Sequence, residues 1–157
     1  MRVTNYTVKT DDEKRLILVK ENATNYSALS MLTQPNEVVC FMNDLYDMQH
    51  LAEEYMYMIA TTTKGRPLGV FEVSHGTATA TFVSPREIMI RLLLVGAVAF
   101  LLVHNHPSGC VTPSENDILF TKRINEAGRI LNLTLSDHLI IGDNGAFCSM
   151  RQDGLLI

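Results

Sequence analysis

Short apolar runs alternate with amphipathic stretches along this chain, and the pattern predicts a mixed protein of strands and helices. The uncharged apolar run at 97–103 is typical of a buried strand. Residues 55–61 and 68–73 suit a pleated surface, and the turn at 64–67 between them predicts an antiparallel hairpin. A final strand is expected around 138–141, after the last helical segment.

Three helices are predicted from periodicity and from their end signals. The first covers 35–48, where apolar residues recur at spacings of three and four. The second begins at Ser84, which can cap a helix whose first residue is proline, with Glu87 placed for a capping box, and it ends at Gly96. The third covers about 114–129 and carries an apolar stripe on one side.

The order of these elements predicts an α/β sandwich around a mostly mixed sheet. Two further strands are expected near the N-terminus, at 6–8 and 15–20, and another at 78–83. A length of 157 residues fits one domain, or one domain with a short extension. Such a chain buries enough apolar surface to fold without disulfides or metal staples.

Composition indicates the protein's cellular compartment and bears on nucleic-acid and membrane binding, but it says little about the reaction. The net charge of −4 gives no support for binding to a nucleic-acid backbone, although a local basic patch stays open. The three cysteines are odd in number and widely spaced, which favours a reducing compartment. The N-terminus lacks a signal-peptide pattern, and the apolar window at 88–103 is interrupted by Arg91 and Gly96. We therefore expect a soluble, cytoplasmic protein that does not enter a membrane.

The candidate chemistry lies directly after the strand at 97–103. His104 and His106 are separated by one residue, so on an extended chain both rings point to one side. Asp117 follows eleven residues later, behind a loop rich in proline and glycine that turns the chain back. Two imidazoles and a carboxylate are good zinc ligands, and three protein ligands with one open position are typical of catalytic zinc. Water at that position would lose its proton near pH ~7.

Other interpretations of these residues remain open at this point. Ser114 and Asp117 also have the spacing of a capping box, and a helix start can serve both purposes. A proton-transfer group outside the ligand set is expected, and Glu53 and Glu54 are the candidates, although they could simply be a solvated charge pair. His138 is expected to support the site or to pack in the core, and not to bind metal.

The motifs together resemble a known family. The spacing of His104 and His106, seven residues, then Ser114 and Asp117 matches the histidine-to-aspartate part of the JAMM (MPN+) metalloprotease signature. The fuller pattern resembles the bacterial RadC-type JAB domain. The positions that carry this second resemblance are 76–77, 85–87, 104–109, 112–114, 117, 121 and 137–138.

The resemblance implies roles for particular residues. Its zinc ligands, for one Zn²⁺ per chain, would be His104, His106 and Asp117. Ser114 would help to stabilise the oxyanion of a tetrahedral intermediate. The general base would be Glu53, with Glu54 as the neighbouring alternative. The implied fold is the JAB/MPN α-β-α sandwich with a mixed sheet, similar to that of cytidine deaminases.

The resemblance also implies a function and a domain organisation. The function is that of a zinc-dependent hydrolase of the JAMM class, a metallopeptidase or isopeptidase acting on a peptide or protein. The alternatives are a DNA-repair-associated RadC-type factor or metal-dependent nuclease, and a non-catalytic MPN-type binding module. Residues 51–157 would form the RadC-like JAB domain, with 1–50 an N-terminal extension of short strands and a helix packed on it. Nothing in 1–50 resembles the helix-hairpin-helix region that RadC-type proteins commonly carry.

Overall fold

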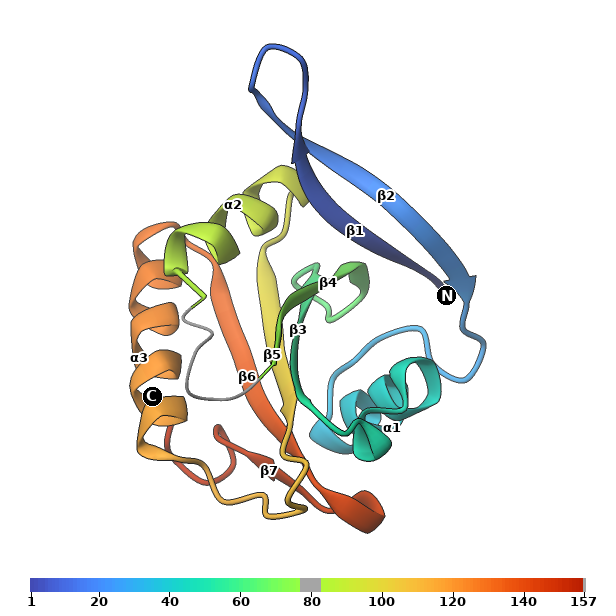
Figure 1. Cartoon of the computed structure of the whole chain (residues 1–157), viewed down its shortest axis with the longest axis vertical. Helices are drawn as coiled ribbons and strands as arrows, with labels where there is room; N and C mark the ends of the chain where they lie inside the picture. The colour runs from blue at the N-terminus through green and yellow to red at the C-terminus, as the bar shows by residue number, and fades with distance from the viewer. Residues whose placement is uncertain (77–82, 157) are drawn as a thin grey trace.

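A computed structural model describes residues 1–76 and 83–156, and the structural statements below concern these residues (Figure 1). Their strands form one mixed sheet in the order β2-β1-β4-β3-β5-β6-β7. The elements are β1 (Arg2–Thr10), β2 (Leu16–Asn25), α1 (Pro35–Tyr46), β3 (Glu54–Thr61), β4 (Pro67–Gly76), α2 (Pro85–Val95), β5 (Ala99–Asn105), α3 (Glu115–Ile130), β6 (Thr134–Ile141) and β7 (Phe147–Ser149), with short 3₁₀ helices at Met48–His50 and Asp143–Gly145.

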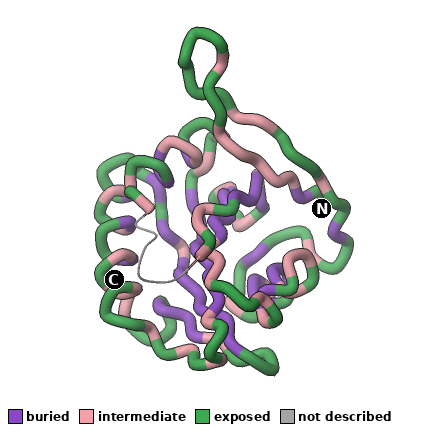
Figure 2. Tube along the Cα trace, viewed as in Figure 1, coloured by how far each residue is buried: buried purple, intermediate pink, exposed green. Residues whose placement is uncertain are grey.

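Helices cover both faces of the sheet, which confirms the predicted mixed α-β-α sandwich. Alternate side chains of a strand point to opposite faces. In β3, Tyr57 and Ile59 pack with α1, whereas Met58 and Ala60 pack with α2 and α3. Figure 2 shows the buried residues gathered along the central strands, where every residue of β5 is buried. Each face of β5 therefore contributes to its own core.

The central strand pairing decides where α3 begins. β5 is antiparallel to β3 and parallel to β6. A parallel pair cannot be joined by a tight turn, so the chain must return along the sheet before β6, and α3 makes this return. The first turn of α3 consequently lies near the end of β5, where the two predicted histidine ligands stand.

The helix α2 follows its predicted boundaries. The Ser84 Oγ accepts a hydrogen bond from the Arg86 backbone N–H at 3.2 Å. Gly96 ends the helix with φ 71°, a left-handed conformation that costs glycine little. The carboxylate of Glu87 pairs with Arg86 at 3.1 Å and with Arg91 at 3.5 Å. Glu87 therefore sits in a surface ion-pair group and not in the predicted capping box.

Some elements differ from expectation. The two N-terminal strands are longer than predicted and form the hairpin β1–β2, which joins the same sheet where Asn5 pairs with Val70. The short strand β7 was not predicted. The strand expected at 78–83 lies, except for its last residue, outside the described residues. The division of the chain at residue 50 stays a prediction. No helix in the described parts of the chain is long and apolar enough to cross a membrane.

Candidate metal centre

The two histidines are positioned by β5. Phe100 and Leu102 point from this strand into the core under α2 and α3, and His104 continues the same row. Its side chain is fully buried. His106 stands just beyond the strand, and its side chain keeps 16% exposure. The alternation of β5 thus directs both rings toward the start of α3, as the sequence predicted.

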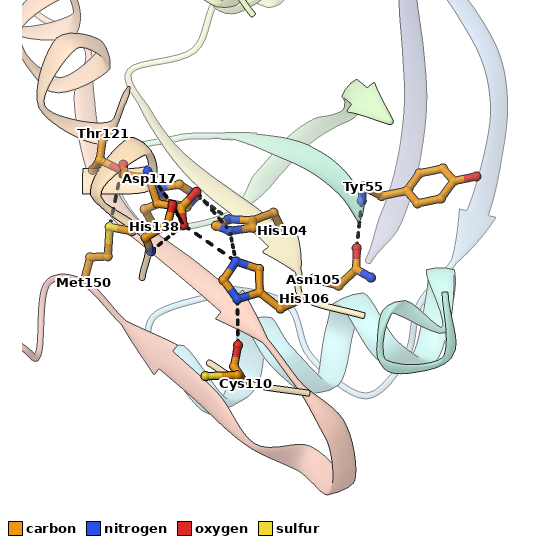
Figure 3. Close-up of polar contacts among 10 residues, drawn as sticks. Tyr55, His104, Asn105, His106, Cys110, Asp117, Thr121, His138 and Met150 are labelled. Carbon is orange, nitrogen blue, oxygen red and sulfur yellow. Dashed lines mark hydrogen bonds and ion pairs between the residues drawn. The ribbon is translucent and has the colours of Figure 1, made fainter. Parts of the chain in front are cut away.

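Asp117 is aimed at these rings by the capping of α3. Its Oδ2 accepts hydrogen bonds from the Ser114 N–H at 2.8 Å and from the Ser114 Oγ–H at 2.6 Å. The Asp117 N–H in turn donates to the Ser114 Oγ at 3.1 Å. The Asp117 Oδ1 then lies 3.5 Å from the His104 Nε2, and Oδ2 lies 3.6 Å from the His106 Nε2 (Figure 3). The capping box and the approach to the histidines occur together.

A fourth group, Glu54, completes the cluster. One ligand atom each from Glu54, His104, His106 and Asp117 lies within 4.8 Å of the others, so the group could hold a metal ion. Glu54 is the first residue of β3, and Met56 in that strand pairs with His104 of β5. Because Glu54 precedes Met56 by two residues, it points to the same face of the sheet.

Glu53, the base expected from the resemblance, is not part of this cluster. Its side chain is 61% exposed, and its Oε2 lies 3.7 Å from the Nε2 of His75. Glu53 directly precedes Glu54 in the chain, and adjacent residues at a strand start point to opposite faces. The structure therefore brings the neighbouring alternative, Glu54, to the histidines.

Asn105, between the two histidines, secures the start of β3. Its Oδ1 accepts a hydrogen bond from the Tyr55 N–H at 2.8 Å. Its Nδ2 donates to the carbonyl of Glu53 at 3.0 Å. These two backbone groups lie on either side of Glu54, so Asn105 holds the segment that directs the Glu54 side chain. Its position between two histidines was the only sequence signal, and sequence reasoning missed it.

The two carboxyl groups of the cluster have pKa values shifted in opposite directions. Burial raises the pKa of Glu54; Asp117 adds to this effect, and His106 opposes it. Burial also raises the pKa of Asp117, but His106, His104 and the hydrogen bonds from Ser114 outweigh it and hold this pKa below its usual range. A carboxylate held ionised suits a metal ligand, whereas one with a raised pKa suits proton transfer.

The imidazoles also differ. Burial lowers the pKa of His104 to about 4, so its ring is neutral at pH ~7. Asp117 raises the pKa of His106, burial opposes this, and the Cys110 carbonyl adds to the rise. The His106 Nδ1 lies 2.6 Å from that carbonyl oxygen. Since a carbonyl can only accept, Nδ1 carries a proton, so in its neutral form the ring presents a lone pair at Nε2.

This arrangement of lone pairs fits a metal cation. The His106 Nε2 faces the His104 Nε2 at 3.1 Å, beside the ionised Asp117. Neutral imidazole nitrogens and a carboxylate converge, and a divalent cation would satisfy all of them at once. Nitrogen and oxygen donors of this kind suit zinc. The nitrogen and oxygen donors of this cluster therefore fit zinc, the metal that the sequence suggested.

A mixed α-β-α sandwich with a candidate metal-binding cluster at the end of its central strand has the architecture of a JAB/MPN-like domain. The RadC-like JAB domain family matches residues 32–155, and the chain belongs to this family.

Relatives support the same placement. The chain is 39% identical over 127 residues to the UPF0758 protein of Moorella thermoacetica, which is 81% of this chain and 54% of the relative. It is 36% identical over 128 residues to the UPF0758 protein of Pelobacter propionicus, covering 82% of this chain and 55% of the relative. The chain spans about half the length of the curated relatives it matches.

Proposed function

We propose that this domain is a zinc-dependent hydrolase of peptide or isopeptide bonds. The observation that carries the proposal is the convergence of Glu54, His104, His106 and Asp117 within 4.8 Å at the end of β5. His104, His106 and Asp117 would hold the zinc ion. Membership of the RadC-like JAB family supports a hydrolytic role for such a centre.

Zinc, when bound, would supply a Lewis acid that brings the pKa of water down to ~7. Glu54 would accept the proton of the attacking water and return one to the leaving amine, because its half-buried carboxyl has a raised pKa and stands beside the ligands. The exposed Glu53 would take no part. Asp117, held ionised, would remain a ligand throughout.

Ser114 would have two duties. Its hydroxyl now donates to Asp117 and caps α3. Because it is exposed at the rim of the cluster, rotation about its Cα–Cβ bond would turn the O–H toward a substrate carbonyl oxygen. A donor placed there would stabilise the oxyanion that develops on that oxygen. The capping box would then be the resting arrangement.

The test is a substrate profile with the metal removed and restored. The protein would be incubated with a peptide library and with isopeptide-linked conjugates, and the products identified by mass spectrometry. We expect cleavage that a chelator abolishes and added zinc restores. A parallel incubation with single-stranded and duplex DNA covers the nuclease alternative. Zinc-dependent cleavage of DNA alone, or no cleavage of any substrate by zinc-loaded protein, would refute the proposal.

A further inference from the structure

A second buried histidine lies behind His104. His138 belongs to β6, where it pairs with Leu102 of β5, and its side chain is fully buried. The His138 Nε2 lies 2.8 Å from the His104 Nδ1. The His138 Nδ1 lies 2.6 Å from the Oγ1 of Thr121 on α3. These contacts join the three side chains in a continuous row behind His104.

The far end of this row determines its proton arrangement. The Thr121 Oγ1 lies 2.6 Å from the backbone carbonyl oxygen of Asp117, one helical turn earlier. A carbonyl can only accept, so the single hydroxyl proton of Thr121 goes to Asp117. The other neighbour, the Met150 sulfur at 3.3 Å, is a weak acceptor. Toward His138 the Thr121 oxygen therefore accepts, and the His138 Nδ1 must carry a proton.

The proton position at Thr121 fixes the proton positions on the His138 ring and then on the His104 ring. The His138 side chain is fully buried between the Thr121 hydroxyl and the His104 ring, and burying a charge without a counter-ion is costly, so the ring is neutral. With its one ring proton at Nδ1, His138 presents a lone pair at Nε2, which accepts from the Nδ1–H of His104. The neutral His104 is left with a lone pair at Nε2, the atom that faces His106 and Asp117.

We propose that Thr121 and His138 are positioning residues that hold His104 as its Nδ1–H tautomer, with the Nε2 lone pair directed at the metal. The proposal rests on the proposed function in taking zinc as the ion. In the opposite tautomer the His104 Nε2 would carry a proton and could not bind a metal. Partners of this kind behind a metal-binding histidine change metal affinity by roughly 10–100-fold.

The position of His138 is itself held by a buried carboxylate. Asp137 accepts the His138 backbone N–H at 2.8 Å and the Arg151 N–H at 3.0 Å. It also accepts the hydroxyl of Ser149. These bonds tie β6 to the turn that follows β7, so the His138 ring has little freedom to leave its place between His104 and Thr121.

The direct test is the tautomer of each ring, measured by long-range ¹H–¹⁵N correlation NMR on the zinc-free protein at pH 8. We expect a proton on Nδ1 and none on Nε2 for both His104 and His138. A proton on the His138 Nε2 would overturn the inference. Because this measurement needs neither zinc nor a substrate, it is independent of whether the protein hydrolyses anything.

Zinc titration of variants tests the consequence. Thr121→Val removes the acceptor for His138, frees the opposite tautomer, and should weaken zinc binding about 10-fold, whereas Thr121→Ser should stay within about twofold. Met150→Leu is the matched control, since the Met150 sulfur contacts the same Thr121 hydroxyl but does not determine which His138 nitrogen carries the proton. Its affinity should equal that of the wild type.

A second pair tests His138 directly. His138→Leu leaves His104 with no acceptor, and His138→Gln restores one, so the glutamine variant should recover zinc affinity if both fold. If His138→Leu does not fold, the Thr121 pair decides. Equal zinc affinity in Thr121→Val and Thr121→Ser refutes the positioning role of Thr121 and His138 but leaves the proposed hydrolysis standing. If the predicted tautomers are found but no substrate is hydrolysed, the proposed function is refuted and the positioning role of Thr121 and His138 stands.

Discussion

The two faces of the sheet differ in what the same strands contribute: one face carries apolar core residues and the other carries buried histidines. On the α1 side, Leu101 and Leu139 of β5 and β6 pack in an apolar core. On the α3 side, the same strands carry His104 and His138, both fully buried. Burying an unpaired polar group costs about 1–3 kcal/mol, and the buried His138 ring avoids this cost because both of its nitrogens have hydrogen-bond partners.

Because adjacent residues of a strand point to opposite faces, the same strands can supply core packing on one face and the candidate site on the other. His104 and Glu54 point to the α3 side, while their neighbours Asn105 and Glu53 point away from it. A buried polar row that leaves the His104 Nε2 lone pair for a metal is better explained by a site than by stability, because apolar residues of similar volume would stabilise a core as well or better. Substitutions on the two faces should therefore have separable effects.

The largest contrast is expected within β5. His104→Ala should reduce bound zinc from about one per chain to none, because it removes a buried ligand of the centre. Leu101→Ala on the opposite face should retain zinc but lower the free energy of unfolding by about 2–5 kcal/mol. Elemental analysis and denaturant unfolding measure the two effects. Zinc retained in His104→Ala would break the distinction between the faces.

The next contrast separates the adjacent glutamates. Glu54→Gln should retain zinc and lower kcat by roughly 10²–10⁴-fold, the usual effect of losing a general base. Glu53→Gln should leave kcat within about twofold, since its exposed side chain lies away from the cluster. Steady-state kinetics on a cleaved peptide provides the comparison. Equal loss in both variants would contradict the assignment of the base to Glu54.

Asn105 should have a smaller effect on the same step. Asn105→Ala releases the backbone on both sides of Glu54, and a shift of about 1 Å in a catalytic group can cost up to ~10²-fold in rate. We expect a loss of kcat of roughly 10-fold, with zinc content and KM unchanged. If zinc is lost instead, Asn105 acts on the histidines and not on β3.

The smallest contrast compares two helix starts. Ser84→Ala and Ser114→Ala should each lower the free energy of unfolding by about 1 kcal/mol, because each serine caps a helix. Only Ser114→Ala should also lower kcat, since only that cap adjoins the metal cluster. Turnover unchanged in Ser114→Ala would restrict Ser114 to capping.

Much of this architecture could be predicted because its signals are local. Strand alternation and helix caps depend on a few neighbouring residues, so the sandwich, α2 and the convergence of His104, His106 and Asp117 followed from pattern and resemblance. β7 was missed because a strand of three residues has too little periodicity to detect.

What escaped prediction depends on contacts distant in sequence. The choice between Glu53 and Glu54 follows from where β3 begins, and Asn105 holds that point across 50 residues. Strand ends are the least certain feature of a sequence pattern, and a shift of one residue exchanges the faces. The row from His104 to Thr121 likewise joins three separate elements, β5, β6 and α3.

The most direct test of the central claim is a crystal structure of the zinc-loaded protein with anomalous data at the zinc edge. We predict one zinc per chain, about 2.0–2.2 Å from the Nε2 atoms of His104 and His106 and from one Asp117 oxygen. Glu54 should lie outside bonding distance and contact a water on the ion. An absent zinc peak, or Glu54 bound as a fourth protein ligand that closes the site, would contradict the proposed three-ligand zinc site with Glu54 as its base.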